Sequence, residues 1–298
     1  MRYAGEIAAL GTAFCWAIGA NLFTVAGRRM GAAVLNRHRL LVGALLLAAA
    51  LWITRGAPWP SWASSSAVAL LAASGLIGFA IGDTWFFRAL VILGAGRAVL
   101  MSSLAPILTA AIGWPVLGER LGPMALLGVA LTVGGVVWVL MEQQAHPHAS
   151  RHGKLAAGVV AGLLAALGQA IGYVLSKLAL RTGLDPLSAN VIRIVVGAVA
   201  IWSWAILRGQ VGATLGAVRD RGAAASMVGG TVFGPVLGVV LSLAALAYIE
   251  AGVAASIIAI NPVLTLLISS RFHGEVFTLR SLLGALLAVA GVVVLFLR

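Results

Sequence analysis

The chain has 298 residues, of which 61% are hydrophobic and only 9% are charged, and its mean hydropathy is +1.07. A soluble domain carries about 25% charged residues, so this composition excludes a water-soluble globular protein and indicates an integral membrane protein. The net charge of +12 does not indicate nucleic-acid binding, because the lysines and arginines fall mostly between apolar segments, where they meet lipid headgroups.

Apolar segments long enough to cross a bilayer follow one another along the whole chain. A hydrocarbon core of about 30 Å needs about 20 apolar residues in a helix. The N-terminal segment is interpreted as an uncleaved first helix, because a second copy of it occurs later in the chain. The runs are continuous and too long for barrel strands, so the class is all-α. Ten spans are predicted, near residues 6–26, 36–54, 66–93, 97–117, 122–141, 154–178, 187–207, 223–249, 253–271 and 279–297.

The third and eighth predicted spans are longer than a bilayer requires. Such spans are tilted or bent. Pro235, which follows Gly234 in the eighth span, predicts a bend at that point.

The second half of the chain repeats the first. Residues 90–119 align without a gap to residues 246–275, at an offset of 156 and with ten identities in thirty positions. The repeat predicts two halves of five spans, residues 1–143 and 154–298, joined by a linker at 144–153. An odd number of spans turns the second copy upside down in the membrane. The sequence therefore predicts ten transmembrane helices as two inverted five-helix repeats, an arrangement typical of secondary transporters.

The repeated motifs resemble the EamA family of the drug/metabolite transporter superfamily. The matching residues are Ala89-Leu90, a short turn from Gly94 to Ala98, Leu104 to Thr109, Leu117 to Leu121, and Gly128 to Gly135. The second copy keeps the pattern in altered form, with the sequences INPVLT and HGEVF. The resemblance implies a membrane transporter but does not indicate a substrate. It also implies cytoplasmic termini, whereas the distribution of lysine and arginine favours the opposite orientation.

Asp83 is the only acidic residue deep inside a predicted span. An ionisable group at that depth usually faces a cavity or a partner. Phe79 and Phe87 lie at i−4 and i+4, on the same helical face. Asp83 is interpreted either as a pathway residue that binds a proton or a substrate amine, or as a structural partner of an arginine or the backbone. Arg88 lies about 140° further around the helix, so it is expected to extend to the membrane interface.

Other polar residues are predicted to line the same transport pathway. Trp16 in the first span aligns with Gln169 in the sixth, and Gln169 shares a helical face with Tyr173. Asn261 precedes Pro262 and Ser103 lies three residues before Pro106, and both are expected to satisfy freed backbone groups or to touch substrate. A pocket lined by aromatic rings and amide groups suits a small polar metabolite. The alternative is that these side chains pack in the core or against lipid.

Two prolines and two arginines occupy equivalent positions in the two halves. Pro106 and Pro262 are predicted to kink the fourth and ninth spans, because each removes a helical hydrogen bond. Arg39 and Arg193 lie near the starts of the second and seventh spans. They are expected to form a gate or an anion contact, or to anchor at the interface. Asn36 is predicted to cap the start of its helix.

No motif for catalysis, nucleotide binding or metal binding is found, so neither an enzyme nor a cofactor nor a metal site is expected. His146, His148 and His152 in the linker are interpreted as a solvated loop. The sequence predicts a secondary transporter in the bacterial inner (cytoplasmic) membrane that exports a small metabolite or amino acid by alternating access. Facilitated uptake or exchange, and a flippase for a lipid headgroup or carrier lipid, are the alternatives. A proton is a candidate coupling ion, and the choice between monomer and homodimer stays open.

Overall fold

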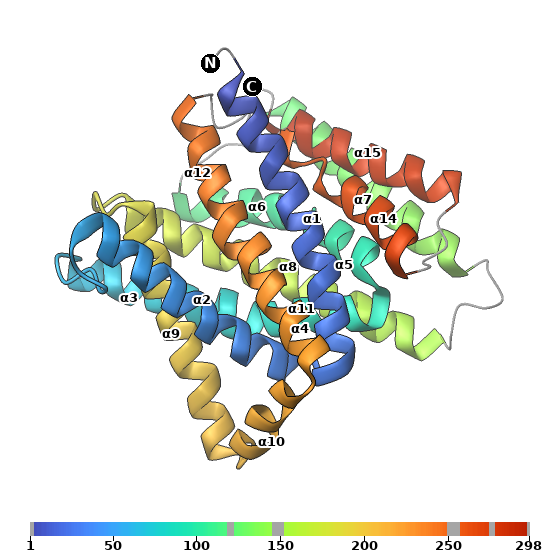
Figure 1. The fold of residues 1–298 in the computed structure, drawn as a ribbon. Coiled ribbons are helices and arrows are strands. Elements are labelled where there is room, and N and C mark those ends of the chain that lie inside the picture. The colour runs from blue at the N-terminus through green and yellow to red at the C-terminus, as the bar shows by residue number, and fades with distance from the viewer. Residues whose placement is uncertain (1–2, 118–121, 145–151, 249–256, 274–277, 297–298) are drawn as a thin grey trace.

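The computed structural model describes residues 3–117, 122–144, 152–248, 257–273 and 278–296. Every regular element within these ranges is helical (Figure 1). Seven helices are long and apolar enough to cross a membrane, and two shorter apolar helices cover residues 126–141 and 279–294. The chain is therefore a multi-pass, all-helical membrane protein. Most of the predicted linker and the start of the predicted ninth span lie outside the described residues.

Seven of the ten predicted spans coincide with the long apolar helices, and the fifth and tenth coincide with the two shorter ones. The third span comprises α3, η1 and α4, and the eighth comprises α11, η3 and α12. In chain order the elements are α1 (Ala4–Met30), α2 (Ala32–Arg55), α3 (Ser65–Ser74), η1 (Gly75–Gly82), α4 (Asp83–Leu93), α5 (Ala95–Ser102), α6 (Ala105–Leu117), α7 (Pro123–Gln144), α8 (His152–Leu180), α9 (Pro186–Leu207), α10 (Val211–Gly216), η2 (Ala217–Arg219), α11 (Arg221–Thr231), η3 (Val232–Gly238), α12 (Val239–Tyr248), α14 (Asn261–His273) and α15 (Leu279–Phe296).

The two long spans each contain a π-helical segment at the same place in the repeat. These segments are η1 and η3, and both end at glycines that are 156 positions apart, Gly82 and Gly238. A π-helical turn widens the helix and disturbs its hydrogen-bond ladder, and such turns occur often at functional sites. The predicted bend in the eighth span is therefore a π-helical segment, with Pro235 inside it.

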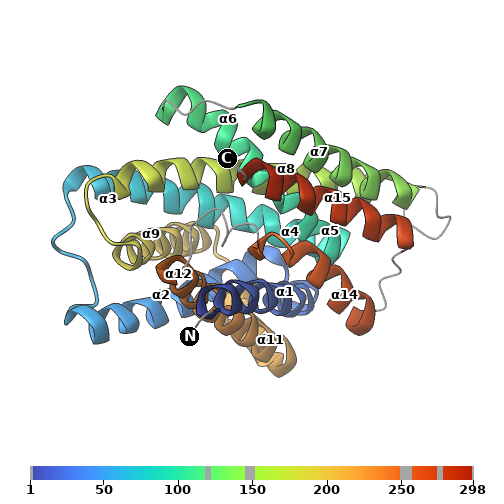
Figure 2. The same ribbon diagram turned by 90° about the horizontal axis from the view of Figure 1, so that it is seen from above.

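Each half of the molecule packs its first helix against the third span of the other half. Helix α1 contacts α11, η3 and α12, and helix α8 contacts α3, η1 and α4. Figure 2 shows both arrangements, with α1 beside α11 and α12 and with α8 beside α3. Glycines face each other at both contacts: a Cβ built on Gly19 would lie 3.2 Å from the Gly234 Cα, and one on Gly172 would lie 3.4 Å from the Gly78 Cα. This reciprocity is the contact pattern of two units related by a twofold axis.

The last helices of the two halves, α7 and α15, pack directly against each other. A Cβ on Gly135 would lie 2.5 Å from the Gly284 carbonyl oxygen, and one on Gly291 would lie 2.6 Å from the Gly128 carbonyl oxygen. Residue numbers therefore rise along α7 as they fall along α15, so the two helices are antiparallel. Small residues allow this close backbone approach within a membrane.

The fourth and ninth spans are interrupted rather than kinked. Helix α5 ends at Ser102 and α6 begins at Ala105, so Pro106 is the second residue of a new helix. Pro262 likewise is the second residue of α14. Proline is tolerated in the first turn because the amides there have no intrahelical acceptor. The prediction of a kink inside each helix was wrong, since these prolines start a helix instead.

Candidate functional site

A cavity of about 760 Å³ lies between the two halves. This volume falls in the range of about 300–1,000 Å³ that is usual for small-molecule sites. Arg39, Arg193 and the two helix-starting prolines lie on its wall. Arg88 does not: its side chain is exposed and lies over the Trp85 ring. All eight residues predicted for the pathway line the cavity, namely Trp16, Phe79, Asp83, Phe87, Ser103, Gln169, Tyr173 and Asn261.

Arg39 and Asp83 form a buried ion pair on the cavity wall. The Arg39 Nη1 donates to the Asp83 Oδ2 at 2.6 Å, and both side chains are buried. The Arg39 guanidinium also lies 5.5 Å from the ring centre of Phe79 and 5.6 Å from that of Phe87. Arg39 therefore does not anchor at the membrane interface. Asp83 has a cationic partner, and that partner comes from the neighbouring span and not from Arg88.

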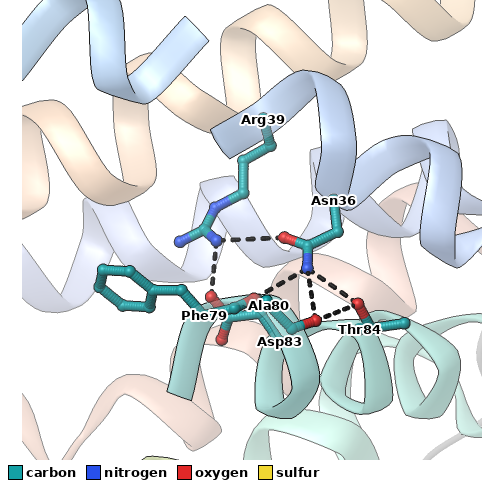
Figure 3. A network of polar contacts seen from close by, with 6 residues as sticks. All are labelled: Asn36, Arg39, Phe79, Ala80, Asp83 and Thr84. Carbon is teal, nitrogen blue, oxygen red and sulfur yellow. Dashed lines mark hydrogen bonds and ion pairs between the residues drawn. The ribbon is translucent and has the colours of Figure 1, made fainter. Parts of the chain in front are cut away.

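Asn36 ties this ion pair to the π-helical segment (Figure 3). Its Nδ2 donates to the Phe79 carbonyl and to the Thr84 Oγ1, both at 2.9 Å, and its Oδ1 accepts from the Arg39 Nη1 at 3.4 Å. Thr84 in turn donates to the Ala80 carbonyl at 2.6 Å. The expectation that Asn36 caps its helix was wrong: α2 begins four residues earlier, and the amide instead satisfies groups of the third span.

Arg193 is the counterpart of Arg39 in the second half, but it forms no ion pair among the described residues, and the acid whose charge acts on it is again Asp83. Its guanidinium lies 4.3 Å from the ring centre of Phe79, and its buried Nε has no hydrogen-bond acceptor. In the repeat, the position equivalent to Asp83 is Val239, which also lines the cavity. The second half therefore keeps the arginine and lacks the carboxylate.

The remaining predicted residues lie on helices from both halves. The Trp16 indole nitrogen lies directly against Gly238 at the end of η3, where a Cβ would collide with it. Gln169 and Tyr173 share the cavity face of α8, and 49% of the Tyr173 surface is exposed. The Asn261 Oδ1 accepts from the Thr265 Oγ1 at 3.0 Å. The structure thus brings residues from both ends of the sequence around one space.

Comparison with known protein families matches residues 3–141 and 156–297 to the EamA-like transporter family. The chain belongs to the EamA-like transporter family. It is thereby a membrane protein of the drug/metabolite transporter superfamily. A solved crystal structure superimposes on this EamA chain with a TM-score of 0.63, at 18% identity, over 99% of this chain and 96% of the other. At that identity the likeness concerns the fold alone. No curated protein matches the chain significantly.

One end of the EamA cavity is closed by a polar cluster that sequence reasoning missed. The Arg37 guanidinium donates to the Gln210 Oε1 and, at 2.7 Å, to the Thr214 Oγ1. The His38 Nε2 lies 2.9 Å from the Thr214 carbonyl, and the Trp202 Nε1 donates to the Arg37 carbonyl at 3.0 Å. These contacts join the start of α2 to the α9–α10 turn. The signal was the run Asn-Arg-His-Arg at 36–39, which is unusually polar for a span.

The opposite end of the EamA cavity extends toward the α8–α9 turn. Its lining continues along α8 through Lys177 and Leu180 and resumes at Pro186 and Leu187 of α9. None of the residues in the Arg37 cluster lines the cavity. The cavity therefore reaches the α8–α9 end, and the polar cluster separates it from the α9–α10 end.

Proposed function

We propose that this EamA-family protein is a secondary transporter that exports a small polar metabolite across the bacterial cytoplasmic membrane by alternating access. The observation that carries the proposal is the central cavity, which is bounded by both halves and extends toward one end of the bundle only. Secondary transporters bind substrate near the midplane, between two structural repeats, and expose it to one side at a time. In this proposal a gradient of an ion or of the substrate drives transport.

The architecture we propose is ten spans in two inverted halves, residues 1–143 and 154–298. Three observations support it: the reciprocal packing of α1 and α8 on the third spans, the equivalent π-helical segments, and the antiparallel packing of α7 against α15. Equivalent helices that run antiparallel belong to units of opposite orientation in the membrane. Because five is an odd number, five spans in each half account for that reversal.

Closure of one end supports alternating access. The Arg37 cluster is held by four hydrogen bonds between spans that are far apart in sequence, so a change to the other state requires these bonds to break. At the opposite end the only ion pair between the neighbouring turns, within the described residues, is the 3.9 Å contact of Arg55 with Asp185. An exposed ion pair of this kind contributes about 0–1 kcal/mol. The two ends are therefore held with different strength.

A metabolite suits the cavity better than a lipid headgroup does. A flippase that pairs two arginines with a phosphate needs both guanidinium groups free, and Arg39 is bound to Asp83. Proton coupling forms part of the proposal, because Asp83 is the buried acid that would take up a proton when it releases Arg39. We propose that each chain holds a complete pathway, whether the protein is a monomer or a homodimer.

The direct test is transport by purified protein in proteoliposomes. Liposomes would be loaded with a panel of labelled amino acids and small organic acids, and efflux would be measured with and without an imposed pH gradient. Flux of at least one compound above empty liposomes is expected, and Asp83→Asn should abolish it. Arg88→Gln is the matched control, because Arg88 lies outside the cavity. Equal flux in Asp83→Asn and wild type would remove Asp83 from the mechanism, and no flux of any compound would contradict the transporter proposal.

A further inference from the structure

The cavity wall carries more positive than negative charge. Two arginines, Arg39 and Arg193, line it, and Asp83 is the one acid among the described residues of the lining. A charge at membrane depth costs at least about 2.5–3.5 kcal/mol, so an excess charge there usually meets a partner or a ligand. The charge of the lining therefore favours a ligand with a negative group.

The two arginines of the repeat differ in what they can still bind. Arg39 is neutralised by Asp83 at 2.6 Å and also contacts Asn36. Arg193 stacks on Phe79 but has no ion pair or hydrogen bond from its side chain within the described part of the chain. A stacked ring attracts the cation but offers no acceptor for its N–H groups. Arg193 thus keeps its donors for a ligand.

The shape of a guanidinium defines the kind of group that it binds best. Arginine presents five donors in a planar fork that matches the two oxygens of a carboxylate or a phosphate. Contact with the Phe79 ring at 4.3 Å restricts the movement of that fork, which lowers the entropy lost when a ligand binds. The repeat explains why no carboxylate is paired with Arg193: Val239 occupies the position that Asp83 has in the first half.

The rest of the cavity wall is suited to contact with the apolar part of a ligand. Aromatic side chains dominate around the arginine, and a planar apolar group can lie against their faces. The cavity volume of about 760 Å³ limits the ligand to metabolite size. The aromatic residues on the wall are Trp16, Phe23, Phe79, Phe86, Phe87 and Tyr173.

We propose that the substrate of this transporter is a small organic anion with an apolar body, and that Arg193 binds its carboxylate or phosphate group. This inference rests on the proposed transport function and adds the substrate class. Arg193 is then the residue that determines specificity for charge, whereas Arg39 on the adjoining wall is occupied by Asp83.

Binding to the purified protein tests the inference without the need for transport. Four probes on one scaffold would be titrated by calorimetry: 3-phenylpropionate, phenyl phosphate, the neutral 3-phenylpropanamide and the cationic phenethylamine. At least one anion should bind about tenfold or more tightly than the amide, because a hydrogen bond to a charged group contributes about 1.5–3 kcal/mol. The comparison between the two anions shows whether the carboxylate or the phosphate is preferred.

Arg193→Gln should remove the preference for the anions, and Arg88→Gln should keep it. Melting temperature controls for folding, and if Arg193→Gln unfolds, the same titration in Val239→Asp replaces it. The inference is overturned if the amide or the amine binds as tightly as the anions, if Arg193→Gln retains the preference, or if no anion binds.

Measuring flux of the same four probes in proteoliposomes separates the two proposals. Flux of the amide or the amine alone supports transport and rejects an anionic substrate. Arg193-dependent binding of an anion without flux of any probe leaves an anion site in place and rejects the transport function.

Discussion

The two halves of the molecule share a backbone plan but differ in the side chains that they present to the cavity. In the first half Arg39 is paired with Asp83, and Asn36 holds both to the π-helical segment. In the second half Arg193 has no such partner, since Val239 takes the place of the acid. The first half thus pairs its arginine with an acid, whereas the arginine of the second half forms no ion pair within the described residues, and the Nε atoms of both arginines have no hydrogen-bond partner there.

The backbone contacts between helices recur in both halves, whereas the side chains on the cavity wall differ between them. Contacts between glycines recur in matched pairs, as in α1 against η3 and α8 against η1, because a backbone that approaches so closely admits no side chain. Side chains on the cavity wall have no such constraint. The two halves therefore share the same backbone contacts, and they differ in the side chains on the cavity wall.

The largest effect is expected from Asp83→Asn, which breaks the buried ion pair of the first half. Removal of one partner leaves Arg39 buried without a counter-charge, and in protein interiors this costs about 3–5 kcal/mol. We expect transport to fall at least about 100-fold, equivalent to about 2.7 kcal/mol. Flux in proteoliposomes and the melting temperature of the purified protein measure the two effects. Wild-type values for both would show that the ion pair is dispensable.

The reverse change, Val239→Asp, gives the second half the acid that it lacks. A carboxylate at this position should pair with Arg193 and compete with an anionic ligand. We expect anion affinity to drop about tenfold, or about 1.4 kcal/mol. Val239→Asn is the matched control, with similar size and no charge, and it should keep most of the affinity. If both variants bind anions equally, charge at position 239 does not reach the ligand.

Alanine at Gly135 or Gly291 tests the symmetric frame. A Cβ on Gly135 would lie 2.5 Å from the Ala288 amide nitrogen, so α7 and α15 must separate. Overpacking of this kind costs about 1–3 kcal/mol, and the two substitutions should cost similar amounts because the contacts are reciprocal. Gly134→Ala is the control, since nothing lies within 4 Å of its Cβ. Thermal unfolding in detergent measures the differences, and a destabilised Gly134→Ala with an unaffected Gly135→Ala would contradict the packing.

The smallest expected effect on stability concerns the N-termini of α2 and α9, which are the second helices of the two halves. Helix α9 is capped by Asp185, which accepts from the Ser188 amide at 3.0 Å, whereas α2 starts at Gly31 without a side-chain cap. Partial burial alone would raise the pKa of Asp185, but hydrogen bonds from Ser188 and the charge of Arg55 outweigh it and lower the pKa. Asp185→Ala should cost about 1 kcal/mol.

The pH dependence of that difference has a defined sign. Because the folded pKa of Asp185 lies below the unfolded one, the stabilisation is present above the unfolded value of about 3.9 and is lost as the pH falls through the folded value. Wild type should therefore lose its advantage over Asp185→Ala under strongly acidic conditions, which melting temperatures measured from neutral pH downward would show. An advantage that grows as the pH falls would rule out this role.

The sequence alone predicted the helical class, the two EamA repeats, and some of the residues that line the cavity, such as Asp83 and Tyr173. Apolar length and glycine spacing carry those signals, because a bilayer imposes both on any spanning helix. Partners across helices could not be predicted. Arg39 and Asp83 lie 44 positions apart, and Arg37 and Thr214 lie 177 apart, so their contacts depend on how spans cross. Periodicity places a side chain on a face but does not say which helix meets that face.

The measurement that tests the account most directly is access to the cavity from each side of the membrane. Cys15 is the only cysteine, so Cys15→Ser gives a background for single cysteines on the cavity wall. Leu187→Cys reports on the α8–α9 end, and Val99→Cys reports on the α9–α10 end, because Val99 packs in one hydrophobic cluster with Leu35 at the start of α2. A membrane-impermeant maleimide, applied to oriented vesicles, should label Leu187→Cys from the α8–α9 side and leave Val99→Cys unlabelled from the other. Addition of Arg37→Ala, which breaks the closing cluster, should reverse the pattern. Labelling of both positions from their own sides in the same protein, with or without Arg37, would mean an open channel and would contradict alternating access.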